Sequence, residues 1–159
     1  MVFLDTNVLN YALLSQDKQK RKQALAILAK AFTGNDFAIS AQVLSECANV
    51  LFKKGGLDAR TVSECIDYFK QIETIVPVTE QLIKRAIEIK GLYGLQFFDS
   101  QIIAAAEKAE CTEIWSEDFG EGQLYCGILC VNPFRRRISP QRCSSEHRRK
   151  SSGPLCLGD

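Results

Sequence analysis

Short apolar runs alternate along the chain with longer segments in which apolar residues recur every three or four positions. The short runs predict β-strands at residues 2–4, 37–39, 74–78, 113–115 and 128–131. The longer segments predict α-helices at residues 8–14, 18–32, 41–54, 59–72, 79–93 and 97–109. This alternation is typical of an α/β fold with a parallel β-sheet flanked by α-helices on both faces.

Capping residues mark the ends of several predicted helices. Ser40, Asp58 and Thr79 each precede a helix and belong to the residue types preferred at N-caps. Gly34 follows the helix at 18–32, a position where a glycine with left-handed backbone often ends a helix. These signals support the boundaries that the apolar pattern predicts.

Length and charge predict one domain followed by a tail. The 159 residues, of which 46% are hydrophobic, suffice for a single core. Residues 1–134 hold 13 basic and 17 acidic side chains, whereas residues 135–159 hold seven basic and two acidic ones. We therefore expect one domain at 1–134 and a disordered basic tail at 135–159, which either contacts phosphates or is merely solvated.

The chain shows no pattern of a secreted or membrane protein. Its first residues reach an acid at Asp5 without a basic region, and no apolar run approaches the roughly 18 residues of a membrane span. The seven cysteines contain no Cys-x-x-Cys pair, which favours reduced thiols over a disulfide framework. We expect a soluble, cytoplasmic protein without a membrane partner.

Four acidic residues occupy positions where a carboxylate is unexpected. Asp99 precedes Ile102 and Ile103 on one helical stripe, and Glu46 borders the apolar stripe of its own helix. Asp5 and Asp118 follow predicted strands, and the carboxyl ends of parallel strands share one edge of a sheet. The four acids are therefore expected to meet at that edge.

Each acid also has a purely structural interpretation. Asp5 can cap the following helix, and Asp99 can sit in a first helical turn, where the helix dipole favours a negative charge. Glu46 can lie on a solvated helix edge, and Asp118 can be an ordinary turn residue. The case for a site rests on the four positions agreeing with one another.

Clustered carboxylates require a positive counter-charge. Two carboxylates about 4 Å apart repel by ~1 kcal/mol in water and ~4 kcal/mol at an effective dielectric constant of 20. Because the chain has no histidine before His147 and no cysteines at ligand spacing, the site would offer only oxygen, which suits Mg²⁺ or Mn²⁺. This chemistry indicates hydrolysis of a phosphodiester by metal-activated water.

Other hydrolytic chemistries have little support in the sequence. His147 lies in the tail, which disfavours a Ser-His-Asp triad, and Asn7 replaces the second acid that an aspartyl phosphatase would need. Neither a phosphate-binding loop nor a dinucleotide-binding glycine motif is present.

Several motifs in this order resemble a PIN domain, and most closely the VapC-type toxins of bacterial toxin–antitoxin systems. They are VFLDTN at 2–7, SE at 45–46, FDSQIIAAA at 98–106, SEDFGEGQ at 116–123 and NPF at 132–134. The resemblance spans residues 1–134 and implies a Mg²⁺- or Mn²⁺-dependent endoribonuclease. The basic tail departs from the family pattern.

The resemblance assigns roles to particular residues. Metal-coordinating acids of the family match Asp5, Glu46, Asp99 and Asp118, and hydroxyl positions beside the metal match Thr6 and Ser116. Asn7 is a weaker candidate, and Glu121 is a further acid that either assists or has no role.

The resemblance also implies partners: an RNA substrate, a small cognate antitoxin that covers the cleft, and a second copy in a homodimer. Two alternatives remain open at this stage, a housekeeping PIN nuclease that processes RNA without an antitoxin, and a catalytically silent PIN-like module that binds RNA or protein.

Overall fold

The computed structural model describes residues 1–135. The tail predicted to be disordered, from Arg136 onward, lies outside the described residues. The strands are β1 (Val2–Leu4), β2 (Phe37–Ser40), β3 (Thr74–Val76), β4 (Glu113–Trp115), β5 (Leu124–Tyr125) and β6 (Ile128–Val131). The helices are α1 (Thr6–Leu14), α2 (Lys18–Thr33), α3 (Ala41–Lys53), α4 (Ala59–Phe69), α5 (Glu80–Tyr93) and α6 (Phe97–Lys108). The elements confirm the predicted alternation of strands and helices.

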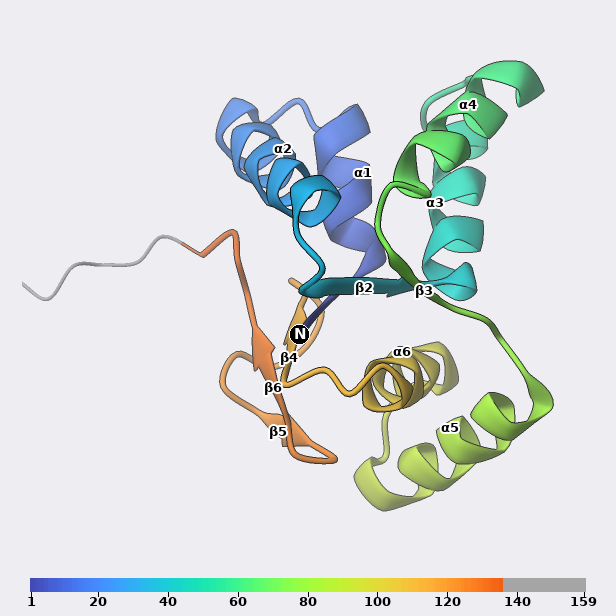
Figure 1. Cartoon of the computed structure of the whole chain (residues 1–159), viewed down its shortest axis with the longest axis vertical. Helices are drawn as coiled ribbons and strands as arrows, with labels where there is room; N and C mark the ends of the chain where they lie inside the picture. Colours follow the sequence, from blue (N-terminus) through green and yellow to red (C-terminus); the bar gives the residue numbers. More distant parts are fainter. Residues whose placement is uncertain (136–159) are drawn as a thin grey trace, which may run out of the picture.

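The strands form one sheet in the order β3-β2-β1-β4-β6-β5. All neighbouring strands pair in parallel except β5, which pairs antiparallel with β6. Figure 1 shows α1 to α4 on one face of this sheet and α5 and α6 on the other. The predicted α/β fold, with helices on both faces of a mainly parallel sheet, is therefore confirmed.

The core lies on both faces of the sheet. Phe3 and Leu4 are adjacent in β1 and point to opposite faces, yet both are fully buried, as are Ile39 and Ile114 in the neighbouring strands. Strands buried on both faces read as continuous apolar runs, which is why they stand out in the sequence. Burying a side chain of this size stabilises the fold by about 1.5–3 kcal/mol.

Several local features differ from the sequence predictions. β3 ends at Val76 rather than at residue 78, because Pro77 has no N–H to offer the sheet, and α4 ends at Phe69 rather than at residue 72. Gly34 has φ −127° and ψ 152°, so extended backbone ends α2 and leads directly toward β2. Helix α1 begins at Thr6 rather than residue 8, because Asp5 caps it. The β5–β6 hairpin was not predicted; its turn at Cys126 and Gly127 has positive φ at both residues, which matches the twist of a tight hairpin.

No helix within residues 1–135 combines the length and apolar character that a membrane crossing requires.

Candidate functional site

The pairing of β1 with β4 brings Asp5 and Ser116 together. Leu4 pairs with Trp115, and the residue after each strand therefore lies at the same edge of the sheet. The Ser116 hydroxyl donates a hydrogen bond to Oδ2 of Asp5 over 2.5 Å. A side-chain contact between residues 111 positions apart is thus a direct result of strand register.

Asp5 both caps a helix and faces the site. Its Oδ1 accepts the backbone N–H of Thr6 at 2.6 Å, which is the capping role considered from the sequence. Its Oδ2 accepts the Ser116 hydroxyl, and only 6% of the residue is exposed. The capping role of Asp5 is therefore compatible with a role in the site, because a different carboxylate oxygen faces Ser116.

Ser116 and Asn7 connect Asp5 with Asp118. The Ser116 Oγ accepts the backbone N–H of Asp118 at 3.0 Å and the Asn7 side-chain amide at 3.1 Å. The same amide nitrogen lies 3.3 Å from Oδ2 of Asp5 and 3.3 Å from Oδ2 of Asp118. Asn7 therefore sits between two of the predicted acids, in a more central place than the sequence indicated.

Glu46 joins the site through Thr6. The Thr6 hydroxyl donates to Oε2 of Glu46 at 2.8 Å, and the Gln42 amide donates to Oε1 at 2.7 Å. The Gln42 amide also contacts the backbone carbonyl of Phe98 at 3.1 Å, which ties α3 to the start of α6. Gln42 was not predicted, although its position one turn before Glu46 within a buried stripe was a readable signal.

Asp99 lies in the first turn of α6 and faces the other acids. Burial raises the pKa of its carboxyl, and the charges of Asp118 and Glu46 raise it further. No hydrogen-bond donor or cation within residues 1–135 compensates this carboxylate. Asp99 is therefore an uncompensated member of the acidic cluster.

The electrostatics of Asp5 show the same excess of negative charge. Burial raises its pKa to about 6, the charges of Asp118 and Glu46 act in the same direction, and the hydrogen bonds from Ser116 and Thr6 oppose them. The structure thus brings together the four predicted acids and both predicted hydroxyl residues, so that the carboxylates interact electrostatically. We name these six residues, with Asn7, the acidic cluster.

The donor atoms of the acidic cluster fit a hard divalent cation that retains water. All of its possible ligand atoms are oxygens, and the Oδ1 of Asn7 is buried without a hydrogen-bond partner in residues 1–135, as is the Oε1 of the neighbouring Gln42. In residues 1–135 no three His, Cys, Asp or Glu side chains are arranged to hold an ion directly. The cation would therefore be ligated by one or two carboxylates and by water, which is the mode that Mg²⁺ usually adopts.

A second cluster holds the loop that carries Asp118. Glu117 accepts hydrogen bonds from the Tyr11 hydroxyl and from the Lys20 ammonium, the latter at 2.6 Å. The ammonium also lies 4.7 Å from the centroid of the Tyr11 ring. These contacts join α1 and α2 to the loop after β4, and sequence spacing gave no hint of them.

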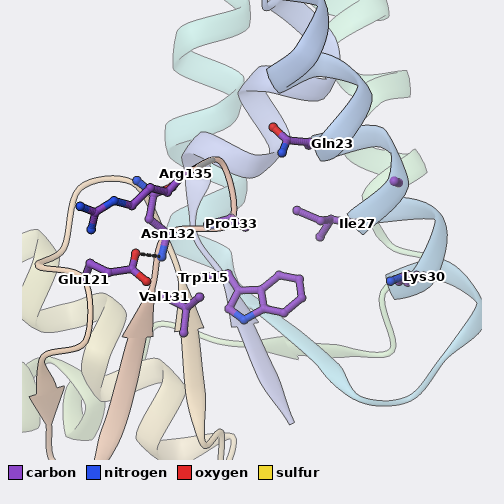
Figure 2. Close-up of a pocket in the computed structure, with 10 residues that line it drawn as sticks. Gln23, Ile27, Lys30, Trp115, Glu121, Val131, Asn132, Pro133 and Arg135 are labelled. Atoms are coloured by element: carbon purple, nitrogen blue, oxygen red, sulfur yellow. Dashed lines mark hydrogen bonds between the residues drawn. The ribbon is translucent and has the colours of Figure 1, made fainter. Parts of the chain in front are cut away.

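Glu121 is not part of the acidic cluster. Its Oε2 accepts the backbone N–H of Asn132 at 2.7 Å, across the loop after β4. It lines a separate pocket with Trp115 and Asn132, shown in Figure 2.

A cavity of about 370 Å³ opens beside the acidic cluster. Residues of α1 and α3 form its walls with Asp118; they are Asn7, Asn10, Tyr11, Leu14, Ser15, Val50 and Lys54. Lys54 makes no ion pair within residues 1–135, and the Oδ1 of Asn10 is buried without a partner. The cavity therefore offers a cation and unpaired amide oxygen next to an acid of the cluster.

Replacing Ser116 with alanine is expected to lower the free energy of unfolding by about 1–3 kcal/mol. The backbone N–H of Asp118 loses its acceptor, and Asp5 loses a donor that opposes the rise of its pKa. Urea unfolding measures the loss. Ser100→Ala is the matched control, because Ser100 is equally buried but its hydroxyl contacts only the Gln96 carbonyl one turn earlier. Equal losses in both variants would contradict the role assigned to Ser116.

Comparison with known proteins identifies a matching family. The model of the PIN-domain family matches residues 2–120. No curated protein matches this chain.

Solved structures with the same fold include three of bacterial proteins. VapC20 of Mycobacterium tuberculosis, described as a sarcin-ricin loop cleaving toxin, is 18% identical, with a TM-score of 0.63 over 81% of this chain and 99% of that one. A toxin–antitoxin complex from Klebsiella pneumoniae is 20% identical, with a TM-score of 0.62 over 84% and 98%. VapBC2 from Rickettsia felis, bound to a DNA fragment from its promoter, is 17% identical, with a TM-score of 0.61 over 83% and 98%. At these identities the likeness establishes the fold alone.

Proposed function

Because this chain belongs to the PIN-domain family, we propose that it is a divalent-metal-dependent endoribonuclease and the toxin of a type II toxin–antitoxin system. The observation that carries the proposal is the acidic cluster, in which a buried Asp5 shares its surroundings with Glu46, Asp99 and Asp118 and no basic side chain of residues 1–135 balances their charge. Such an arrangement is unfavourable by itself, and a bound Mg²⁺ or Mn²⁺ would offset its repulsion. We therefore assign the four acids to a metal site in which one or two of them would ligate the cation directly and the others would act through its bound water.

The chain's own side chains would prepare the site for hydrolysis. Ser116 fixes the orientation of the Asp5 carboxylate, and Thr6 does the same for Glu46. Asn7 holds its amide between Asp5 and Asp118, so that both carboxylates keep their positions. A divalent cation bound there supplies Lewis acidity and lowers the pKa of nearby water. A carboxylate of the cluster would accept the proton of the attacking water as the new P–O bond forms and the P–O bond to the leaving oxygen breaks.

The cavity beside Asp118 is a suitable place for the substrate strand. Lys54 offers a positive charge for a phosphate, and Asn10 offers an amide for a sugar or base. An RNA substrate is also consistent with the description of VapC20 as a toxin that cleaves the sarcin-ricin loop.

We further propose a small antitoxin protein and a second copy of this chain as partners. One of the structures with this fold is a toxin–antitoxin complex, and another, VapBC2, is bound to DNA from its promoter. Helices α5 and α6 expose large apolar side chains, among them Leu92 at 69% and Phe98 at 63%, which is typical of a protein-binding surface. A cytoplasmic location would bring such a protein together with cellular RNA.

Removal of the metal tests the proposed activity. The purified chain is incubated with total RNA and with Mg²⁺, Mn²⁺ or a chelator, and the cut ends are mapped. We expect discrete cleavage with either cation and none with the chelator. RNA that is bound but left intact under all conditions would instead favour the silent PIN-like module. Neutralisation of the activity by a small protein encoded beside this chain would distinguish the toxin from a housekeeping nuclease.

A further inference from the structure

Helix α2 carries an unusual share of the positive charge. Five of the 13 basic residues in 1–134 lie on it, and none of the 17 acidic ones does; the five are Lys18, Lys20, Arg21, Lys22 and Lys30. Only Lys20 has an acidic partner within residues 1–135, namely Glu117. An acidic domain therefore presents one basic helix next to its cluster of carboxylates. Such a concentration of positive charge is typical of a surface that binds the phosphates of a nucleic acid.

A pocket of about 350 Å³ lies between α2 and the chain that follows β6. Figure 2 shows Gln23, Ile27 and Lys30 on the α2 side, Asn132 and Arg135 on the opposite side, and the Trp115 indole between the two sides. This volume lies within the range of small-ligand sites. The pocket is separate from the cavity beside Asp118, with which it shares no residue.

The indole of Trp115 is a fixed aromatic surface. Its Nε1 donates to Oε2 of Glu113 at 2.7 Å, and the Phe37 ring packs edge-on with centroids 5.9 Å apart. Both contacts restrain the ring. Trp115 is also only partly buried. A planar ligand could therefore contact the indole without reorganisation of the side chain.

The remaining walls offer polar groups and positive charge. The Oε1 of Gln23 is buried and has no hydrogen-bond partner among residues 1–135. Lys30 and Arg135 make no ion pair within the described part of the chain, whereas Glu121 is engaged by the backbone N–H of Asn132. The pocket thus holds an aromatic ring and an amide oxygen, and two cations stand at its rim, with the Arg135 guanidinium directed away from the indole (Figure 2). This combination matches a base linked to phosphate better than a purely apolar ligand.

We propose that this pocket binds one nucleotide of a single-stranded RNA, with the base against Trp115 and the flanking phosphates at Lys30 and Arg135. The inference rests on the proposed function, because it gives the RNA substrate a second contact outside the acidic cluster. Trp115 directly precedes Ser116, so the pocket and the cluster lie at the same edge of the sheet. One strand could thus occupy both, and α2 would guide its phosphates between them.

Intrinsic fluorescence tests the proposal directly, because Trp115 is the single tryptophan of the chain. The full chain is titrated with a short single-stranded RNA of mixed sequence, in chelator so that no cleavage occurs. We expect saturable quenching of the emission, and much weaker quenching by a ribose-phosphate chain of the same length without bases. RNA binding by anisotropy with unchanged emission would overturn the proposal, as would equal quenching by the abasic chain. If the pocket instead binds a protein partner, RNA would bind without changing the Trp115 emission.

Two variants give a second measure. Lys30→Ala is expected to reduce the slope of log affinity against log salt by about one. Lys108→Ala should leave the slope unchanged; Lys108 also lies in the last turn of a helix and makes no ion pair among residues 1–135. Trp115→Leu should weaken binding on the order of tenfold. If Trp115→Leu fails to fold, the salt dependence of the two lysine variants still tests the proposal, because Lys30 is exposed. Equal slopes for Lys30→Ala and Lys108→Ala would overturn it.

Failure of this inference is distinguishable from failure of the proposed function. Metal-dependent cleavage of RNA without quenching of Trp115 would contradict nucleotide binding in the pocket and support the nuclease function. Quenching of Trp115 by RNA, with no cleavage when Mg²⁺ or Mn²⁺ is present, would support nucleotide binding in the pocket and contradict the nuclease function.

Discussion

Asp5→Asn is expected to lower metal-dependent RNA cleavage on the order of a thousandfold or more while the chain remains folded. The substitution keeps the size of the side chain and an oxygen that can accept the Thr6 N–H, but it removes the buried charge at the centre of the acidic cluster. Loss of metal-derived stabilisation of a transition state is worth several kcal/mol, and each 1.4 kcal/mol is a factor of ten in rate. The effect on rate should therefore be large and the effect on packing small.

The comparison is between initial cleavage rates of the wild type and the variant on one defined RNA. Asp58→Asn is the matched control, because Asp58 also caps a helix through its carboxylate but lies exposed at the start of α4. This control should cleave at the wild-type rate. Cleavage retained by Asp5→Asn, with circular dichroism unchanged, would remove the acidic cluster from the mechanism.

The fold was predictable because its strongest determinants are local. Phe3 and Leu4 form an apolar run that only a strand buried on both faces accommodates, and Ser40 and Thr79 cap the helices that they were expected to cap. The antiparallel β5 was missed, since two residues carry no periodicity. Its turn residues, Cys126 and Gly127, were a weak local signal.

The site was predictable only in part. The strand ends placed Asp5 and Asp118 at one edge, and the break in an apolar stripe marked Asp99, because these signals depend on position within an element. The bridging place of Asn7 and the attachment of Gln42 to Phe98 depend on side-chain conformation and on the distance between helices. Contacts between residues 50 or more positions apart produce no periodic pattern in the sequence, so the sequence alone does not predict them.

The contribution of Asp5 to the stability of the wild type is expected to fall as the pH rises from about 4 to about 6. Folding raises the pKa of Asp5 from its usual 3.8 to about 6, so the folded state holds this proton more tightly than the unfolded state does. Stability therefore decreases with pH between the two values and is constant above them. Two pKa units correspond to about 3 kcal/mol, a large part of the 5–15 kcal/mol of an ordinary domain.

Urea unfolding of the wild type and Asp5→Asn over this range isolates the contribution of the single carboxylate. Asp5→Asn should lack the decrease and should be the more stable of the two at neutral pH in chelator. Asp58→Asn should instead be less stable than the wild type at neutral pH. Hydrogen bonds from Thr61 and Arg60 lower the pKa of Asp58, so its carboxylate stabilises the fold only above its own pKa. Mg²⁺ should raise the stability of the wild type at neutral pH, since a ligand of the folded state alone must do so. If the difference in stability between the wild type and Asp5→Asn did not change with pH, and Mg²⁺ left the stability of the wild type unchanged, Asp5 would carry no uncompensated charge. The physical reason for a cation at this edge of the sheet would then be lost.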